Sequence, residues 1–408
     1  MNNPNKPSYL FPLVVMASLF FLFGFITTMN NSTIDFLKNA FGLDAFHKQL
    51  PNTFFYGAYI LSIPVGLMLN RIGYKNGILF GLALISSGFF LCIPGVSMGY
   101  YGFLSAVSVF AIGVVILQVA AAPYVNALGS PETAASRLTL TNALNSVATV
   151  IAPIFVSILL VTPKLEAGMK MENSAIKGIV KGPYMMIGIV TAVILAIMFF
   201  LKLPEIKTEE NGSDGNEKKQ FKSSAFKYPH VWLGSLAIFL YMGLEVGVPS
   251  FFPDYAAKLG IQGVNPVDML KYYWGGMMVG RVVGIFVLRK FKAAKVLTIC
   301  TIGGIALLGS SFALSSSMPN IAMWLFLCIG LFHSIMWPVI YNLALEDLGP
   351  HSKVASGVIA TSVIGASVST LVMGKIQVAT GSVILAVSLM FIYYAYLIFF
   401  AAKGSKIR

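Results

Sequence analysis

Apolar and polar residues alternate in long blocks along this chain, and the apolar blocks are long enough to cross a membrane. A membrane-spanning helix needs about 20 mostly apolar residues, because each residue adds about 1.5 Å to its length. Twelve blocks have that character, at residues 9–38, 51–70, 76–95, 100–127, 137–162, 183–203, 229–257, 268–288, 294–315, 319–346, 353–377 and 382–402. An even number of crossings predicts that both ends of the chain lie on the same side of the membrane.

The first block runs into a polar stretch, "TTMNNSTIDF", that continues its helical pattern. Thr27, Asn31 and Asp35 recur every four residues, so a helix places them on one face, with Thr28 and Asn30 beside them. Two interpretations remain open. The face lines a wet interior, or the helix has left the membrane by Asn30, where two overlapping glycosylation sequons would mark a surface loop.

The composition excludes a soluble globular protein, because 57% of the 408 residues are hydrophobic and only 11% are charged. The net charge of +13 falls between the apolar blocks and does not gather on one polar face, which argues against a nucleic-acid partner. With the termini cytoplasmic, 18 of the 28 Lys and Arg lie on the side of the termini and nine, among them Lys38, Lys48 and Lys375, lie on the other side. The positive-inside rule therefore predicts a multi-pass protein of the cell (inner) membrane with both termini cytoplasmic.

One long polar stretch divides the chain into two halves. Residues 204–228 are rich in Lys, Glu, Ser and Gly, as in a flexible cytoplasmic linker, which predicts a six-helix bundle at 1–203 and another at 229–408. "GLMLNRIGYKNGIL" matches "GIFVLRKFKAAKVL", and "LGSPETAAS" matches "LGPHSKVAS", at nearly one offset between the halves. Parallel repeats of this kind build two halves that rock around a site near the membrane midplane.

Several of these motifs resemble a known family. "GLMLNRIGYKNG" is similar to the loop between the second and third helices of the major facilitator superfamily, and "LQVAAAPYVNALGSPETAASRLTLTNALNS" resembles its fucose–proton symporter and glucose/galactose transporter family. "YGAYILSIPVG" and "YMGLEVGVPSF" are similar to the second and seventh helices of that family. The resemblance implies an all-α membrane protein with twelve transmembrane helices in two six-helix bundles. It also implies import of a hexose, such as glucose, galactose, mannose or fucose, by alternating access.

Polar side chains in the first-half spans are candidates for the substrate site, because a polar group in a span faces a cavity or another polar group. Gln118 precedes three alanines and Pro123, which frees one backbone carbonyl. Asn142 and Asn145 share a helical face, and amides both donate and accept, as sugar hydroxyls do. The alternative for each is a hydrogen bond between helices. The resemblance places Gln118, where the glucose/galactose branch also has glutamine, and both asparagines at the sugar cavity.

Two side chains of opposite charge lie well inside the spans of the second half, away from the span ends. Glu245 lies near the middle of the seventh span and Arg281 lies in the eighth. A carboxylate so placed is either paired or bound to a cation, so a structural Glu245–Arg281 ion pair and a cation-coupling site both remain open. Trp274 and Asn342 would complete the cavity, with an aromatic face for sugar C–H groups and an amide for a hydroxyl.

The expected coupling ion depends on two carboxylates that this sequence lacks. By the resemblance, the two carboxylates of the proton-symporter pattern fall at Asn31 and Gln118, and neither amide titrates. Hard cations favour oxygen ligands, and Asn31, Thr28, Asp35 and Glu245 offer them. We therefore expect Na⁺ as the coupling ion, with H⁺ as the alternative, and expect Asn31 to bind sugar as well.

Sequence motifs that are typical of other function classes are absent from this sequence. It has no nucleotide-binding or hydrolase motif, so we expect neither an enzyme nor an organic cofactor. His333 has no His, Cys or carboxylate at metal-ligand spacing. An uncoupled uniporter or exchanger of the same fold remains an alternative. A sugar sensor would need a signalling domain, for which the linker leaves little room. The expected partners are a monosaccharide and the lipid bilayer, with the protein as a monomer.

Overall fold

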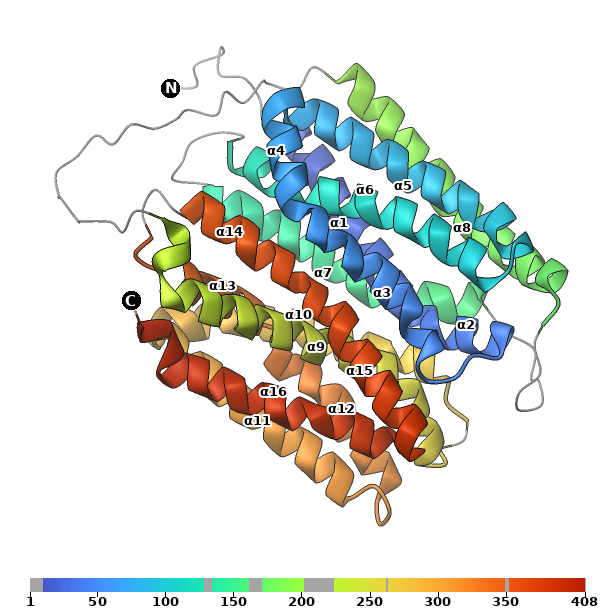
Figure 1. The fold of residues 1–408 in the computed structure, drawn as a ribbon, viewed down its shortest axis with the longest axis vertical. Coiled ribbons are helices and arrows are strands. Elements are labelled where there is room, and N and C mark those ends of the chain that lie inside the picture. Colours follow the sequence, from blue (N-terminus) through green and yellow to red (C-terminus); the bar gives the residue numbers. More distant parts are fainter. Residues whose placement is uncertain are drawn as a thin grey trace.

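The computed structural model describes residues 10–127, 134–160, 171–201, 224–261, 263–348 and 352–407. All regular structure in these residues is helical, and most of the helices run side by side along one direction (Figure 1). The predicted all-α fold is confirmed.

The helices of the first half form six spans, two of which are built from shorter pieces. The pieces are α1 (Leu10–Ser32), α2 (Ile34–Phe41), η1 (His47–Gln49), α3 (Leu50–Gly57), η2 (Ala58–Leu61), α4 (Ser62–Ile72), α5 (Tyr74–Ser97), α6 (Tyr100–Ala127), α7 (Ala134–Leu159) and α8 (Asn173–Phe200). Helix α2 continues α1, and α3, η2 and α4 together make the second span.

The second half has the same organisation. Its elements are η4 (Ala225–Lys227), α9 (Pro229–Lys258), α10 (Pro266–Lys290), α11 (Ala293–Ala313), α12 (Pro319–His333), α13 (Met336–Leu345), α14 (Ser352–Thr361), η6 (Ser362–Ile364), α15 (Gly365–Thr380), α16 (Val383–Ala402) and η7 (Gly404–Lys406). Helices α12 and α13 form one interrupted span, and α14, η6 and α15 form another.

Eleven segments of the described chain are long and apolar enough to cross a membrane. The remaining predicted span is α10, where charged groups such as Lys271 and Arg281 lower the hydropathy, although α10 packs against both α7 and α12. Helix α8 begins at Asn173, ahead of the predicted boundary at 183, which was wrong. Lys177 and Lys181 lie in its first turns and hid the helix from a hydropathy count.

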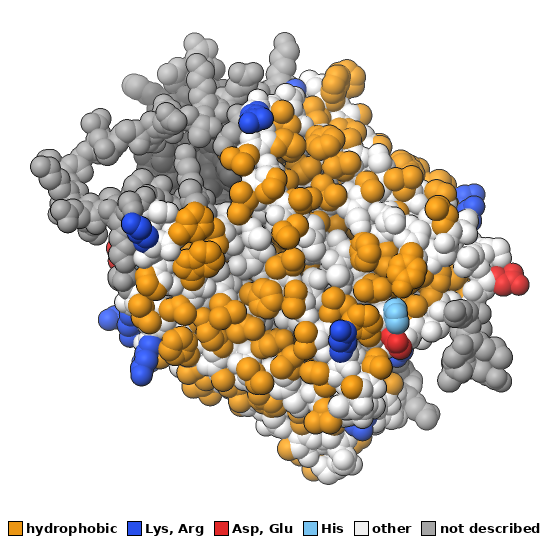
Figure 2. Space-filling model, in the orientation of Figure 1, with side chains coloured by type: hydrophobic (Ala, Val, Ile, Leu, Met, Phe, Trp, Pro, Cys, Tyr) orange, Lys and Arg blue, Asp and Glu red, His pale blue; other side chains and the backbone are white. Residues whose placement is uncertain are grey.

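The surface fits a lipid environment. Figure 2 shows apolar side chains spread over the described part of one face, with most of the charged ones toward its two ends. Phe80, Phe286 and Ile392 are 48%, 61% and 65% exposed, and many other large apolar side chains are as accessible. A soluble monomer rarely exposes such an extensive apolar surface, so the exposed belt indicates a multi-pass membrane protein.

The molecule has two ends, which we call proximal and distal. The proximal end holds the start of α9 and the end of α16, where the Tyr396 hydroxyl donates to the Leu233 carbonyl at 3.0 Å. The distal end holds α2, η1, the end of α9, the start of α10 and the end of α15 (Figure 1). Across the two halves, α7 packs on α10 and α3 packs on α15. The division at 204–228 stays a prediction, because most of that segment lies outside the described residues.

The tenth span is broken between α12 and α13. Pro338 has no N–H to bond the Ser334 carbonyl, and the helix is interrupted there. The neighbouring His333 carbonyl accepts a hydrogen bond from the Tyr241 hydroxyl of α9 at 2.9 Å. A break inside a membrane protein is tolerated where other groups satisfy the backbone, and such breaks mark binding sites in transporters.

Candidate functional site

The polar end of the first span stays helical and lies inside the protein. The Thr33 N–H bonds the Met29 carbonyl at 2.9 Å, which carries the helix across the junction of α1 and α2. Asn30 and Asn31 are only 5% and 2% exposed, and Thr28 is equally buried. The surface-loop interpretation is therefore wrong, and the sequons are chance matches at inaccessible asparagines.

Hydroxyls on this face are used by the helix itself, whereas Asn31 is left with a free acceptor. Thr27 donates to the Phe23 carbonyl at 2.7 Å and Ser32 to the Thr28 carbonyl at 2.9 Å. Asn31 Nδ2 donates to the Tyr56 hydroxyl at 3.1 Å, but its Oδ1 is buried without a partner. A buried acceptor left unpaired costs about 1–3 kcal/mol, so Oδ1 is prepared for a donor or a cation.

The side-chain amide of Gln118 is oriented oppositely to that of Asn31, because its oxygen and not its nitrogen is bonded to a tyrosine. The Tyr59 hydroxyl donates to Gln118 Oε1 at 2.7 Å, which leaves Nε2 to donate elsewhere. Tyr56 and Tyr59 are three residues apart on the second span, with ring centroids 6.2 Å apart. Sequence reasoning did not single out these tyrosines, although the "YGAY" spacing puts both rings on one face of a helix.

The two asparagines of α7 have different surroundings. Asn145 Nδ2 donates to the Phe20 carbonyl at 3.0 Å and lies against Gly24, where a Cβ would come within 2.3 Å of it. Asn145 therefore joins α7 to α1, as the helix-packing alternative expected. Asn142 is exposed and lies one turn before Ser146, so it is the α7 asparagine still accessible to a ligand.

A hydrogen-bonded chain surrounds Glu245 in the second half. The Tyr273 hydroxyl bonds the Glu245 carbonyl at 3.0 Å and His333 Nδ1 at 2.9 Å, and His333 Nε2 bonds the Tyr394 hydroxyl at 2.7 Å. A carbonyl only accepts, so the Tyr273 hydroxyl donates to it and accepts a hydrogen bond from the Nδ1–H of His333. Both ring nitrogens of His333 therefore have partners, and this buried residue joins α9, α10 and α16 around the tenth span.

Glu245 and Arg281 lie between the halves. Arg281 Nη1 donates to Ser146 Oγ of α7 at 2.7 Å, across the interface. Its charge and that of Glu245 attract each other, but no ion pair joins the two groups in the described parts of the chain. The Glu245 carboxylate also lies close enough to Tyr56 and Tyr59 to interact electrostatically with both hydroxyls. The structure thus brings Glu245 near the residues that orient Asn31 and Gln118.

Trp274 and Asn342 offer different groups. Trp274 is 4% exposed and its indole Nε1–H is buried without a partner, so it can donate to a ligand. Asn342 is exposed on α13, beside the stacked rings of Trp337 and Tyr341, whose centroids are 5.0 Å apart. Both residues keep free polar groups.

Asp35 lies apart from these groups. It lines a small polar pocket of about 160 Å³ at the distal end, together with Ser157 of α7 and Asn265 at the start of α10. Thr28, Asn31 and Glu245, the other three residues expected to hold a cation, do not line that pocket, so a cation site shared by these four residues stays a prediction.

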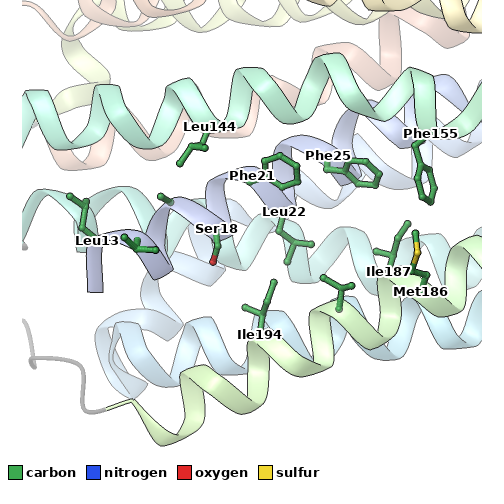
Figure 3. Close-up of a pocket in the computed structure, with 13 residues that line it drawn as sticks. Leu13, Ser18, Phe21, Leu22, Phe25, Leu144, Phe155, Met186, Ile187 and Ile194 are labelled. Atoms are coloured by element: carbon green, nitrogen blue, oxygen red, sulfur yellow. The ribbon is translucent and has the colours of Figure 1, made fainter. Parts of the chain in front are cut away.

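A larger groove has the wrong chemistry for a sugar. It measures about 610 Å³ and runs between α1, α7 and α8, all in the first half (Figure 3). Ser18 is its one hydroxyl side chain, and that hydroxyl donates to the Val15 carbonyl at 2.7 Å. The other lining groups, such as Phe21, Phe25 and Ile194, are apolar. Hydroxyls buried there would lose their hydrogen bonds to water, so the candidate site is the polar cluster between the halves.

Known proteins resemble this chain over nearly its whole length. The sequence model of the Major Facilitator Superfamily matches residues 16–373. The chain is 39% identical over 416 residues to a glucose/galactose transporter of Brucella abortus biovar 1 (strain 9-941), covering 99% of this chain and 98% of that one. It is 29% identical over 419 residues to the L-fucose-proton symporter of Escherichia coli (strain K12), covering 98% and 94%.

Solved structures give the same picture. The crystal structure of FucP, the E. coli fucose:proton symporter, in the outward conformation aligns with a TM-score of 0.71 and 27% identity, covering 98% of this chain and 99% of that chain. A D-xylose-proton symporter aligns with a TM-score of 0.75 at 14% identity, over 98% of both chains, which reflects a shared fold.

Proposed function

Because this chain belongs to the major facilitator superfamily, we propose that it imports a monosaccharide, a hexose such as glucose, galactose, mannose or fucose, by alternating access of its two halves. The names of its relatives support a sugar substrate. The observation that carries the proposal is a pair of buried polar atoms without partners, Asn31 Oδ1 in the first half and Trp274 Nε1 in the second. One accepts and the other donates, which a sugar hydroxyl can match.

Two tyrosines set the hydrogen-bonding sense of this site. The Tyr56 hydroxyl accepts a hydrogen bond from Asn31 Nδ2, so Asn31 Oδ1 remains as an acceptor. The Tyr59 hydroxyl donates to Gln118 Oε1, so Gln118 Nε2 remains as a donor. A hydroxyl facing Asn31 must donate, and a hydroxyl facing Gln118 must accept. Recognition therefore distinguishes sugar analogues by the direction of each hydrogen bond.

Monofluoro and deoxy sugars test this sense, because fluorine accepts weakly and cannot donate. At the hydroxyl facing Gln118 we expect the fluoro sugar to compete better than the deoxy sugar, and at the hydroxyl facing Asn31 we expect both to compete poorly. Tyr59→Phe removes the hydroxyl that orients the Gln118 amide, so the amide can turn. The advantage of the fluoro sugar over the deoxy sugar should then shrink, an advantage of at most about 2- to 13-fold for one hydrogen bond. Competition against labelled sugar measures it.

The control is Tyr101→Phe, since Tyr101 is 63% exposed and lies outside the cluster. An unchanged fluoro and deoxy pattern in Tyr59→Phe would contradict the orientation assigned to Gln118.

The coupling ion is better taken as a proton than as sodium. The sodium expectation finds no support among the relatives whose names state an ion, which are L-fucose-proton symporters. A proton needs one ionisable group, and Glu245 interacts electrostatically with Tyr56 and Tyr59, the hydrogen-bond partners of the two amides that replace the expected carboxylates. Protonating Glu245 removes the negative charge that competes with Ser146 for Arg281, so the proton would control a contact across the two halves.

Uptake under two conditions separates the ions. With labelled sugar in cells or proteoliposomes, we expect concentrative uptake to vanish when a protonophore abolishes the proton gradient, and to persist when choline replaces sodium. Uptake that fails when choline replaces sodium would indicate that sodium is the coupling ion. Uptake that equilibrates and never concentrates under either gradient would favour a uniporter or exchanger, the alternative suggested by the neutral Asn31 and Gln118.

The arrangement in the membrane follows from the charges. With the termini cytoplasmic, as the positive-inside rule predicts, the proximal end faces the cytoplasm and the distal end faces outward. Substrate then enters from the distal end and leaves from the proximal end.

A further inference from the structure

A cluster of charged and polar groups closes the distal end of the molecule. The Asp254 carboxylate, near the end of α9, receives three donors. Lys38 Nζ lies 2.6 Å from Oδ1, Lys48 Nζ contacts Oδ2, and Gln377 Nε2 donates to Oδ2 at 2.8 Å. Lys38 and Lys48 belong to the first half, whereas Asp254 and Gln377 belong to the second. These four residues, the distal cluster, therefore join the two halves.

The distal cluster is inaccessible to water at its centre. The Lys48 and Asp254 side chains are 1% and 6% exposed, whereas Lys38 is 33% exposed and forms the outer edge. The Lys48 ammonium also lies 5.2 Å from the centre of the Phe251 ring. A lysine buried this deeply is retained only where it is paired.

Neighbouring contacts complete the seal between the halves. Asn52 Nδ2 donates to Ser250 Oγ at 3.0 Å across the interface. Gly374 of α15 lies so close to the loop before η1 that a Cβ there would come within 2.6 Å of the Ala45 carbonyl. The closure thus involves backbone as well as side chains.

The chemistry of the distal cluster suits a closure that must reopen. Apolar residues of the same size often stabilise a buried contact as well as an ion pair does. An opened ion pair is hydrated by incoming water, however, while an opened apolar seal exposes apolar area. An ion pair at this position therefore stabilises the closed state and keeps the free-energy cost of the open state low.

We propose that the distal cluster is the outer gate of the transporter, whose ion pairs break each time the distal end opens and re-form when it closes. This inference rests on the proposed function for its place in a transport cycle. The contacts of the distal cluster join the two halves in the structure, whichever substrate the protein carries.

Distances between spin labels test the gate without any substrate. Cys328, the exposed cysteine, is replaced by Ala, and labels are placed through Met98→Cys in the first half and Thr380→Cys in the second, both exposed and near the distal end. The parent should show mainly the short distance of a closed end. Asp254→Asn removes the carboxylate that pairs with Lys48 and leaves only the more distant charge of Asp35 near it, so the ratio of open to closed molecules should rise more than about hundredfold.

Asp268→Asn is the matched control, because Asp268 pairs with Lys271 of its own helix at 2.8 Å, also at the distal end. It should keep the short distance. The double variant Lys48→Met/Asp254→Leu replaces the buried pair by apolar groups, so it should also remain closed, and its uptake should fall because the end no longer opens readily.

Gln377→Ala tests the gate if Asp254→Asn does not fold, since it removes only a neutral donor. It should shift the distances the same way, by about fivefold or more. An Asp254→Asn protein that keeps the short distance, or an equal shift in Asp268→Asn, would overturn the gate. A distance shift without any sugar uptake in the parent would refute the proposed substrate and leave the gate intact.

Discussion

Glu245→Gln should abolish concentrative sugar uptake while leaving exchange of sugar across the membrane. The amide keeps the size and hydrogen bonding of the carboxyl group but cannot gain or lose a proton. A potential of about 100 mV acting on one charge is worth about 2.3 kcal/mol, or about 50-fold accumulation. We expect this accumulation to fall to equilibration in proteoliposomes with an imposed proton gradient, and counterflow of labelled sugar to continue.

Glu172→Gln is the control for this experiment. Glu172 is an exposed carboxylate just before α8, outside the site, so its variant should accumulate sugar like the parent. Full accumulation by Glu245→Gln would assign proton coupling to another group, and loss of both accumulation and counterflow would make Glu245 a substrate-binding residue instead.

Asn31→Leu should weaken sugar binding by about 5- to 150-fold. Leucine has the same branched arrangement of side-chain heavy atoms but no acceptor for the sugar hydroxyl and no donor for Tyr56, and each hydrogen-bonding group left unpaired in a buried site costs about 1–3 kcal/mol. Titration calorimetry on purified protein measures the dissociation constant directly, and a thermal melt checks that the fold survives.

Asn39→Leu provides the comparison, because Asn39 is exposed on α2 and outside the cluster. Binding by Asn39→Leu should match that of the parent. If Asn31→Leu bound sugar as tightly as the parent, the free acceptor of Asn31 would have no part in recognition, and the site would have to be sought elsewhere between the halves.

Hydropathy predicted the spans well because a membrane helix satisfies its own backbone and needs only about 20 apolar residues. It misplaced the start of α8, where two lysines extend the helix beyond its apolar part. It also gave no reason to separate Asn142 from Asn145, since both share one helical face. The difference between the two asparagines comes from α1, because Asn145 packs against Gly24 and donates to the Phe20 carbonyl.

The residues that sequence reasoning missed have partners far along the chain. Lys48 is one of the nine lysines that the sequence places on the outer side, yet it is buried against Asp254, 206 residues away. Tyr59 is an ordinary aromatic residue of an apolar helix until Gln118 of α6 is beside it. Neither pairing is visible in a local pattern.

The sequence by itself determined that this is a helical membrane protein, how its spans are spaced and which polar groups they contain. These properties depend on hydropathy and on hydrogen bonds within one helix, which nearby residues control. The tertiary structure alone decided which of those groups are already paired and which remain open to a ligand. A hydrogen bond or ion pair between halves depends on how distant helices pack, and that packing is the sum of many contacts spread over the whole chain.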